Sequence, residues 1–294
     1  MTHSPIHKQS KALAYGLAAI LLWSTVATAF KLGLRYLAIE QLLFLGIFTS
    51  WLFFLSVLLL KRSFRLLPED RIVAPLMGLL NPFAYYLILF TAYERLPAHI
   101  AQPLNYTWAI TLAILSIPIL KEPLTKNTTF GIALSYLGVF VLVYFSNPQT
   151  EQSIDTIGVF LALLSTVFWA LYWIAGKRSQ SDPISFTFVA FSTALPLSLY
   201  VCLDGPGMPE IDQNTLTFGL WVGLIEMGVT YILWQRALER TNNTGRMAQL
   251  IFLSPFISLV FIATFLGENI TPATIIALLI IVIGTWVTQR KQLA

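Results

Sequence analysis

One carboxylate lies inside an apolar stretch where an ionised group is costly. Glu226 occurs in the sequence Gly223-Leu-Ile-Glu-Met-Gly228, near the middle of an apolar run over residues 215–235. An ionised carboxylate at the centre of a bilayer costs on the order of 2.5–3.5 kcal/mol, so Glu226 is expected to face a cavity or a partner. It could bind a substrate ammonium group, carry a coupling proton, or do both. The alternative is a structural glutamate, protonated or hydrogen-bonded to Asn81 or a tyrosine.

Asn81 is the counterpart of Glu226 when the sequence is aligned with itself at a shift of 145 residues. Pro82 follows it, and a proline inside a helix removes a backbone hydrogen bond and exposes a carbonyl. Within a membrane, such a carbonyl is tolerated only where protein or cavity water can satisfy it. We therefore predict two polar positions, Asn81 and Glu226, at related depths near a substrate site.

Aromatic residues near the middle of their predicted helices could stack on a planar substrate or hold a cation by cation–π attraction. We expect about half of these to contact a cavity; the set is Tyr85, Tyr86, Tyr106, Trp108, Trp169 and Tyr231. Three amides, Gln102, Asn105 and Gln249, could recognise a carboxylate or an amide. They could equally join neighbouring helices by hydrogen bonds.

These residues are set in a chain with the composition of a membrane protein. Of 294 residues, 56% are hydrophobic and 11% are charged, against about 25% charged residues in a soluble domain. The net charge of +4 comes from 18 basic residues with no dense patch, which argues against nucleic-acid binding. There is no Walker loop, no intramembrane Ser–His pair and no histidine cluster, so we expect neither an ATP-driven pump nor an enzyme, and no cofactor or metal.

Apolar runs of about 20 residues are long enough to cross a bilayer as helices. They predict ten transmembrane helices, with limits near 12–33, 40–60, 73–94, 98–119, 127–146, 157–176, 184–203, 215–235, 244–266 and 272–289. The runs do not alternate apolar and polar residues, as the strands of an outer-membrane barrel do. The sequence therefore predicts an all-α integral membrane protein.

The basic residues predict how these helices are oriented. With the N-terminus in the cytoplasm and ten spans, the outer side carries Lys31, Arg35 and Arg95, and the other 15 of the 18 basic residues lie inside. Cytoplasmic loops are enriched in Lys and Arg. We therefore expect a multi-pass protein of the inner membrane with both termini in the cytoplasm.

The sequence also repeats itself. At a shift of 146 residues Trp23 aligns with Trp169 and Lys31 with Lys177. Further matches pair Glu122 with Glu268, Thr125 with Thr271 and Gly138 with Gly284. Each half, 12–146 and 157–290, contains five predicted spans, and this odd number makes the halves enter the membrane from opposite sides. Inverted repeats of this kind are typical of carriers that alternate between outward-open and inward-open states.

The matched residues resemble those of the EamA family of the drug/metabolite transporter superfamily. They are Trp23 and Trp169, Glu94-Arg95-Leu96 and Glu239-Arg240-Thr241, the Glu-x-x-Thr elements ending at Thr125 and Thr271, and Gly131, Gly138 and Gly284. The resemblance covers nearly the whole chain. It implies a fold of two five-helix repeats and a transport activity.

A narrower similarity concerns the fourth predicted helix. Asn105-Tyr106-Thr107-Trp108 is similar to the Asn-Tyr-x-Trp stretch of the aromatic amino acid exporter group, with Ala109 where that group has proline. This resemblance implies that Trp23, Tyr106, Trp108 and Trp169 line a central cavity.

These features favour a secondary transporter that exports an amino acid with an aromatic or apolar side chain. The alternative is efflux of organic cations or drugs, which would use the same glutamate and aromatic rings but needs no group for a substrate carboxylate. A membrane-embedded enzyme or scaffold is a remote third alternative. The expected partners are a small-molecule substrate and bilayer lipid, and the sequence is compatible with proton coupling and with a homodimer.

Overall fold

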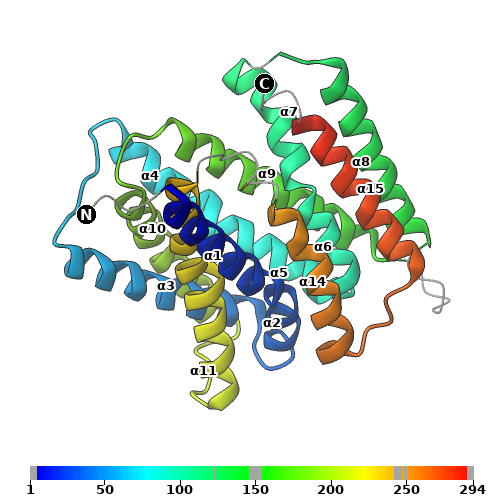
Figure 1. The fold of residues 1–294 in the computed structure, drawn as a ribbon. Helices are drawn as coiled ribbons and strands as arrows, with labels where there is room; N and C mark the ends of the chain where they lie inside the picture. Colours follow the sequence, from blue (N-terminus) through cyan, green and yellow to red (C-terminus); the bar gives the residue numbers. More distant parts are fainter. Residues whose placement is uncertain (1–4, 122, 146–153, 242–246, 248–249, 290–294) are drawn as a thin grey trace.

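A computed structural model of the protein describes residues 5–121, 123–145, 154–241, 247 and 250–289. Over these residues the chain is helical and contains no strand (Figure 1). Two shorter apolar helices, Leu250–Leu266 and Pro272–Thr288, follow eight that are long and apolar enough to cross a membrane. The eight are Gln9–Gly33, Ile39–Lys61, Asp70–Arg95, Ala98–Leu120, Lys126–Phe145, Thr156–Arg178, Pro183–Asp204 and Gln213–Arg240. The all-helical prediction is confirmed, and the count of ten membrane crossings remains a prediction.

Several of these long helices consist of two or three successive segments. The first part of the chain contains α1 (Pro5–Ser24), α2 (Val26–Gly33), α3 (Ile39–Lys61), α4 (Asp70–Gly78), η1 (Leu79–Ala84), α5 (Tyr85–Arg95), α6 (Ala98–Tyr106), α7 (Trp108–Leu120) and α8 (Lys126–Phe145). The second contains α9 (Thr156–Arg178), α10 (Pro183–Asp204), α11 (Gln213–Leu220), η2 (Trp221–Val229), α12 (Thr230–Arg240), η3 (Leu250–Leu253), α14 (Ser254–Phe261), η4 (Ile262–Leu266) and α15 (Pro272–Gln289).

Short polar side chains begin many of the helices. Asp155 Oδ1 accepts a hydrogen bond from the Gly158 amide at 3.0 Å at the start of α9. Thr271 Oγ1 accepts from the Thr274 amide at 3.2 Å at the start of α15. Such N-cap bonds satisfy backbone donors that have no partner inside the helix. The hydrogen bond from Gly158 also holds the pKa of the Asp155 carboxyl below its ordinary value.

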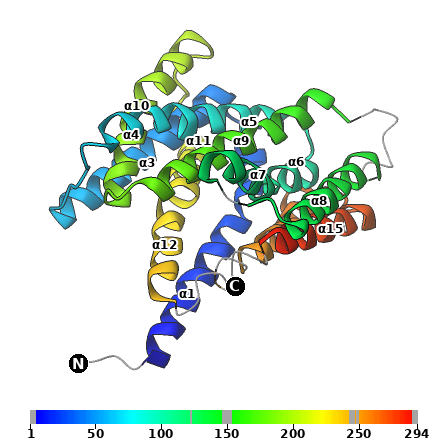
Figure 2. The same ribbon diagram turned by 90° about the horizontal axis from the view of Figure 1, so that it is seen from above.

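Helices α8 and α15 lie side by side and run antiparallel at one edge of the molecule (Figures 1 and 2). A Cβ atom built on Gly131 would lie 2.5 Å from the Gly284 carbonyl oxygen, and one built on Gly138 would lie 2.8 Å from that of Ala277. The shift of 146 residues turns each of these contacts into the other. The pair therefore has the geometry of a local two-fold axis between matching helices.

A second symmetric pair of contacts involves α3 and α10, which each cross a broken helix of the other half. Gly78 of α4 lies against the Ala190 carbonyl of α10. Its counterpart Gly223 of η2 would carry a Cβ only 2.8 Å from the Gly46 carbonyl of α3. Close backbone contact at small residues is how membrane helices commonly pack. Both glycines hold a broken helix against the crossing helix.

Candidate functional site

The third and eighth long helices are interrupted at matching positions. The first break is η1, where Asn81 has non-helical backbone angles of φ −147° and ψ 119° ahead of Pro82. The second is η2, which contains Glu226. Wide turns of this π type often occur at functional sites. Both breaks therefore place a polar side chain where the backbone leaves regular α-helical geometry.

Glu226 is 6% exposed, and its two carboxylate oxygens differ. Oε1 accepts a hydrogen bond from the Tyr86 hydroxyl at 3.0 Å, and the Trp23 side chain is a further polar neighbour. Oε2 is buried and receives no hydrogen bond from any residue that the structure describes. A buried carboxylate oxygen is normally hydrogen-bonded. The tyrosine contact was expected of a structural glutamate, whereas the unpartnered Oε2 is the feature expected of a binding group.

A cavity of about 210 Å³, which we call the deep cavity, contacts Glu226. Seven other residues predicted from the sequence line it: Trp23, Tyr85, Gln102, Asn105, Tyr106, Trp108 and Trp169. Among its described lining residues, Glu226 is the only charged side chain. The deep cavity therefore combines one carboxylate with walls of aromatic rings, a combination suited to an organic ammonium group.

Trp169 lies at the centre of the aromatic walls. Its ring centroid is 4.7 Å from that of Tyr85, 6.1 Å from that of Tyr231 and 6.4 Å from that of Trp108. The last two pairs meet edge to face, a preferred geometry for aromatic rings. Contacts of this kind restrict the positions that these rings can adopt.

Three predicted site residues do not line the deep cavity. The Tyr86 ring is 1% exposed and supports Glu226. Asn81 is 2% exposed, interacts with Tyr231, and lines neither of the two described cavities. Tyr231 lines the neighbouring larger cavity. Gln249 lies outside the described residues.

The predicted amide Asn105 has protein partners. Its Nδ2 donates to Ser165 Oγ at 3.1 Å and to Tyr85 Oη at 3.3 Å. These bonds join α6 to α9 and α5, which favours the helix-joining interpretation for this residue. Gln102, one helical turn earlier, lines the deep cavity, and its buried Oε1 accepts no hydrogen bond from any described residue.

A second cavity of about 470 Å³, which we call the entrance cavity, shares Trp23, Trp173 and Trp234 with the deep cavity. It is lined further by Leu120, Lys177 and Thr288, from the ends of α7, α9 and α15. Its residues thus gather at one end of the bundle, the end that the basic residues predict to face the cytoplasm. Lys177 is the one charged side chain among its described lining residues.

Sequence reasoning missed some cavity residues that helical spacing could have found. Trp173 lies four residues after Trp169, on the same face of α9, and lines both cavities. Its buried Nε1 has no hydrogen-bond partner among the described residues. Tyr93 lies eight residues, about two turns, after Tyr85 and also lines the deep cavity.

Comparison with known proteins places this site in context. Residues 10–144 and 156–290 each match the model of the EamA-like transporter family. Over 285 residues the chain is 25% identical to a protein of Salmonella typhimurium named "Probable amino-acid metabolite efflux pump", with 92% of each chain covered. Over 210 residues it is 25% identical to the threonine/homoserine exporter RhtA of Escherichia coli, covering 70% of this chain and 68% of that protein.

The fold is shared with a solved structure. A crystal structure superposes on the chain with a TM-score of 0.68 at 20% sequence identity, covering 95% of this chain and 98% of the other. An uncharacterized transporter of Archaeoglobus fulgidus is 23% identical over 281 residues, which cover 93% of this chain and 96% of that protein.

Proposed function

The chain belongs to the EamA-like transporter family, and on that premise we propose that it exports an amino acid across the inner membrane by alternating access. The family is one of membrane transporters, so the alternative of an enzyme or scaffold is set aside. We propose an amino acid with an aromatic or apolar side chain as the cargo. The observation that carries this proposal is the buried, unpartnered Oε2 of Glu226 beside the aromatic walls of the deep cavity.

The proposed topology has ten spans, in two inverted halves over residues 12–146 and 157–290, with both termini in the cytoplasm. The antiparallel contacts of α8 and α15 support it, because the final helices of inverted repeats must cross the membrane in opposite directions. The distribution of Lys and Arg supports the orientation. In this topology the entrance cavity faces the cytoplasm, the side from which an exporter takes its cargo.

The polar groups of the deep cavity fit an amino acid. The carboxylate of Glu226 offers a site for an ammonium group at depth, where an unpaired charge is most costly. The buried N–H of Trp173, which has no hydrogen-bond partner among the described residues, belongs to a residue that lines both cavities and can meet a substrate carboxylate. The names of two relatives, an amino-acid metabolite pump and a threonine/homoserine exporter, support the same class.

An organic cation is the second candidate, since it would use Glu226 and the aromatic rings in the same way. It would leave the Trp173 N–H with no complementary group on the cargo. This difference favours the amino acid.

We further propose that Glu226 carries a coupling proton between cargo cycles, because it is the charged residue of the deep cavity.

Transport into and out of liposomes that contain the purified protein tests the cargo. We expect labelled aromatic and apolar amino acids to cross faster than quaternary ammonium compounds. Glu226→Gln should raise the KM for an amino acid about 10- to 100-fold, because a hydrogen bond to a charged group is lost. It should also abolish stimulation by a pH gradient.

Glu69→Gln is the matched control, since Glu69 is an exposed carboxylate outside both cavities. It should leave the KM unchanged. If Glu226→Gln transports with the wild-type KM and the wild-type pH response, the assigned role of Glu226 is wrong. If neither amino acids nor quaternary ammonium compounds cross, the proposed cargo class is wrong.

A further inference from the structure

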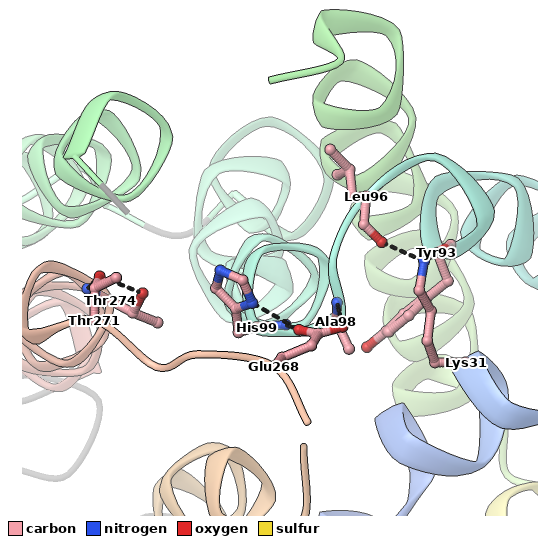
Figure 3. Close-up of polar contacts among 8 residues, drawn as sticks. All are labelled: Lys31, Tyr93, Leu96, Ala98, His99, Glu268, Thr271 and Thr274. Atoms are coloured by element: carbon pink, nitrogen blue, oxygen red, sulfur yellow. Dashed lines mark hydrogen bonds and ion pairs between the residues drawn. The ribbon is translucent and has the colours of Figure 1, made fainter. Parts of the chain in front are cut away.

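The end of the bundle opposite the entrance cavity contains the turn between α5 and α6, residues 93–99 (Figure 3). Helix α9 connects the two ends. Gly158 in its first turn faces Leu96 of this turn, whereas Gly176 near its last residue lines the entrance cavity. A helix of 23 residues is about 35 Å long, close to the thickness of a membrane core. In the proposed topology, the turn therefore lies at the outer end of the bundle.

Three helical segments lead from the deep cavity to this outer end: α2, α6, and α14 with η4. At the end of α2, Lys31 Nζ donates to the Leu96 carbonyl oxygen at 2.7 Å (Figure 3). In the linker after η4, Glu268 Oε1 accepts from the amide of Ala98, the first residue of α6, at 2.8 Å. Helix α2 contacts α14 and η4, and α6 contacts α2 and α14. We call the junction of these three segments the outer seam.

The inner end of the outer seam is joined by hydrogen bonds. Ser24 Oγ, at the end of α1, lies 3.2 Å from Ser254 Oγ, at the start of α14. The hydroxyl of Tyr106, the last residue of α6, donates to the same Ser254 Oγ at 2.8 Å. Tyr106 also lines the deep cavity. The polar atoms where the seam leaves the cavity therefore have partners.

One helical turn closer to the outer end, the polar atoms have no such partners. A step of four residues along each helix keeps the same face and leads to Thr28, Gln102 and Ser258. These residues are 7%, 3% and 0% exposed. Thr28 Oγ1, Gln102 Oε1 and Ser258 Oγ are buried, and none forms a hydrogen bond with a residue that the structure describes. A buried polar atom without a partner costs free energy, so three of them at one level call for an explanation.

Buried serines at other helix contacts do have partners. Ser198 on α10 donates to the Leu195 carbonyl oxygen at 2.8 Å, and Ser135 on α8 donates to that of Ile281 at 3.2 Å. Over the described part of the chain, seven buried side-chain atoms have no hydrogen-bond partner. Four of them belong to α2, α6 and α14: the three named above and His99 Nε2. The unpartnered atoms are therefore concentrated along the outer seam.

We propose that the outer seam is the route by which the deep cavity opens to the outer side. Thr28, Gln102 and Ser258 line this route, and they bind water and the polar groups of the cargo when α2, α6 and α14 separate. Their hydroxyl and amide groups carry no charge, so they can bind a passing polar group weakly enough to release it. The inference rests on the proposed alternating access, but it does not depend on the identity of the cargo.

The unpartnered atoms also favour opening of the seam. The closed seam leaves three hydrogen-bonding groups unpaired, whereas the open seam supplies them with partners. Both effects bring the outward-open state closer in free energy to the closed one, which a carrier needs if it is to visit both states. An apolar seam of the same shape would keep the outer end closed more firmly.

Single cysteines test the route without any substrate. In a Cys202→Ser background, Thr28→Cys and Ser258→Cys each place one thiol in the outer seam. A membrane-impermeant methanethiosulfonate reagent is added to the outside of right-side-out membrane vesicles. A thiol that is reachable only in a minor open state reacts in proportion to the population of that state. Both seam cysteines should react about tenfold or more faster than cysteines at contacts that stay closed.

Ser198→Cys and Ser135→Cys are the matched controls, because both replace a buried serine at a helix contact outside the seam. Gly176→Cys, at an exposed position of the entrance cavity, should react only from the cytoplasmic side and reports that the vesicles are sealed. Thermal unfolding of each variant shows that the cysteine is read in the folded protein. The two seam positions are measured independently, so the test does not depend on one substitution.

A valine substitution tests the role of the unpartnered hydroxyl. Thr28→Val keeps the shape of the side chain and should slow the labelling of Ser258→Cys about three- to tenfold, without lowering the melting temperature. Thr285→Val is the control, since Thr285 Oγ1 already donates to the Ile281 carbonyl oxygen at 2.8 Å. It should leave the labelling of Ser258→Cys unchanged.

The proposed route is wrong if Thr28→Cys and Ser258→Cys react no faster than Ser198→Cys and Ser135→Cys. If one of these controls reacts faster than both seam cysteines, the protein opens outward elsewhere, and alternating access stands without the seam. If Thr28→Val and Thr285→Val slow the labelling equally, the hydroxyl of Thr28 has no special role. If the seam reacts as expected while amino acids fail to cross, the route stands and the proposed cargo is wrong.

Discussion

The two halves of the chain place matching residues in unequal surroundings. Gly78 and Gly223 both hold a broken helix against the crossing helix of the other half, so the scaffold is built twice in the same way. The polar residues at the breaks differ, because Asn81 is an amide away from both described cavities and Glu226 is a carboxylate at the deep cavity. The repeated residues set the shape, and the residues that differ between the halves place one carboxylate at the deep cavity, where we propose that the cargo binds.

Adding a side chain at Gly78 or Gly223, where two helices cross, should have the largest effect on stability. In Gly78→Ala the new Cβ would overlap the Ala190 carbonyl, and in Gly223→Ala it would lie 2.8 Å from that of Gly46. We expect each variant to lose about 3 kcal/mol or more of folding free energy, since neither backbone can move without separating the helices. Thermal unfolding in detergent measures the loss.

Gly176→Ala is the control, because no atom lies within 4 Å of the new Cβ there. Alanine is the better helix former by about 1 kcal/mol, so this variant should melt at or above the wild-type temperature. If Gly78→Ala melts like Gly176→Ala, the crossing does not depend on close backbone contact.

Placing a carboxylate at both helix breaks, at position 81 as well as at Glu226, should have an intermediate effect on stability. Asn81→Asp adds a second carboxylate at a buried position, which should cost on the order of 2.5 kcal/mol of folding free energy. The exchange Asn81→Asp with Glu226→Asn keeps one carboxylate and should recover much of the stability but no transport. Melting temperature and liposome transport measure the two effects. Wild-type transport by the exchange variant would show that the halves are interchangeable, contrary to this interpretation.

The smallest effect is expected at the helix caps that both halves share. Thr125 and Thr271 each accept a hydrogen bond from the backbone amide three residues later, at 3.2 Å in both cases. Thr125→Ala and Thr271→Ala should each lower the folding free energy by about 1 kcal/mol, measured by thermal unfolding. The serine variants keep the cap and should melt like the wild type. A large difference between the two alanine variants would argue against equivalent scaffolds.

The sequence predicted several parts of the site because their signals are local. A carboxylate in an apolar run identified Glu226, and mid-helix position identified Trp169. Tyr86 was also predicted to contact the cavity, yet its ring is buried behind Glu226 and donates to it. Position along the chain indicates depth in the membrane, but it does not say which face of an apolar helix meets a cavity. That face depends on the neighbouring helices.

The sequence by itself could establish the features that depend on residues close together along the chain. Hydropathy located the apolar helices, proline marked the break at Asn81, and threonine marked the start of α15. Tertiary contacts decided which distant segments meet, since Lys31 meets Leu96 across 65 residues and Glu268 meets Ala98 across 170. Lys31 and Lys177 are equivalent in the sequence pattern. Only the structure places Lys31 at the Leu96 carbonyl and Lys177 at the lining of the entrance cavity, because these positions depend on how whole helices pack.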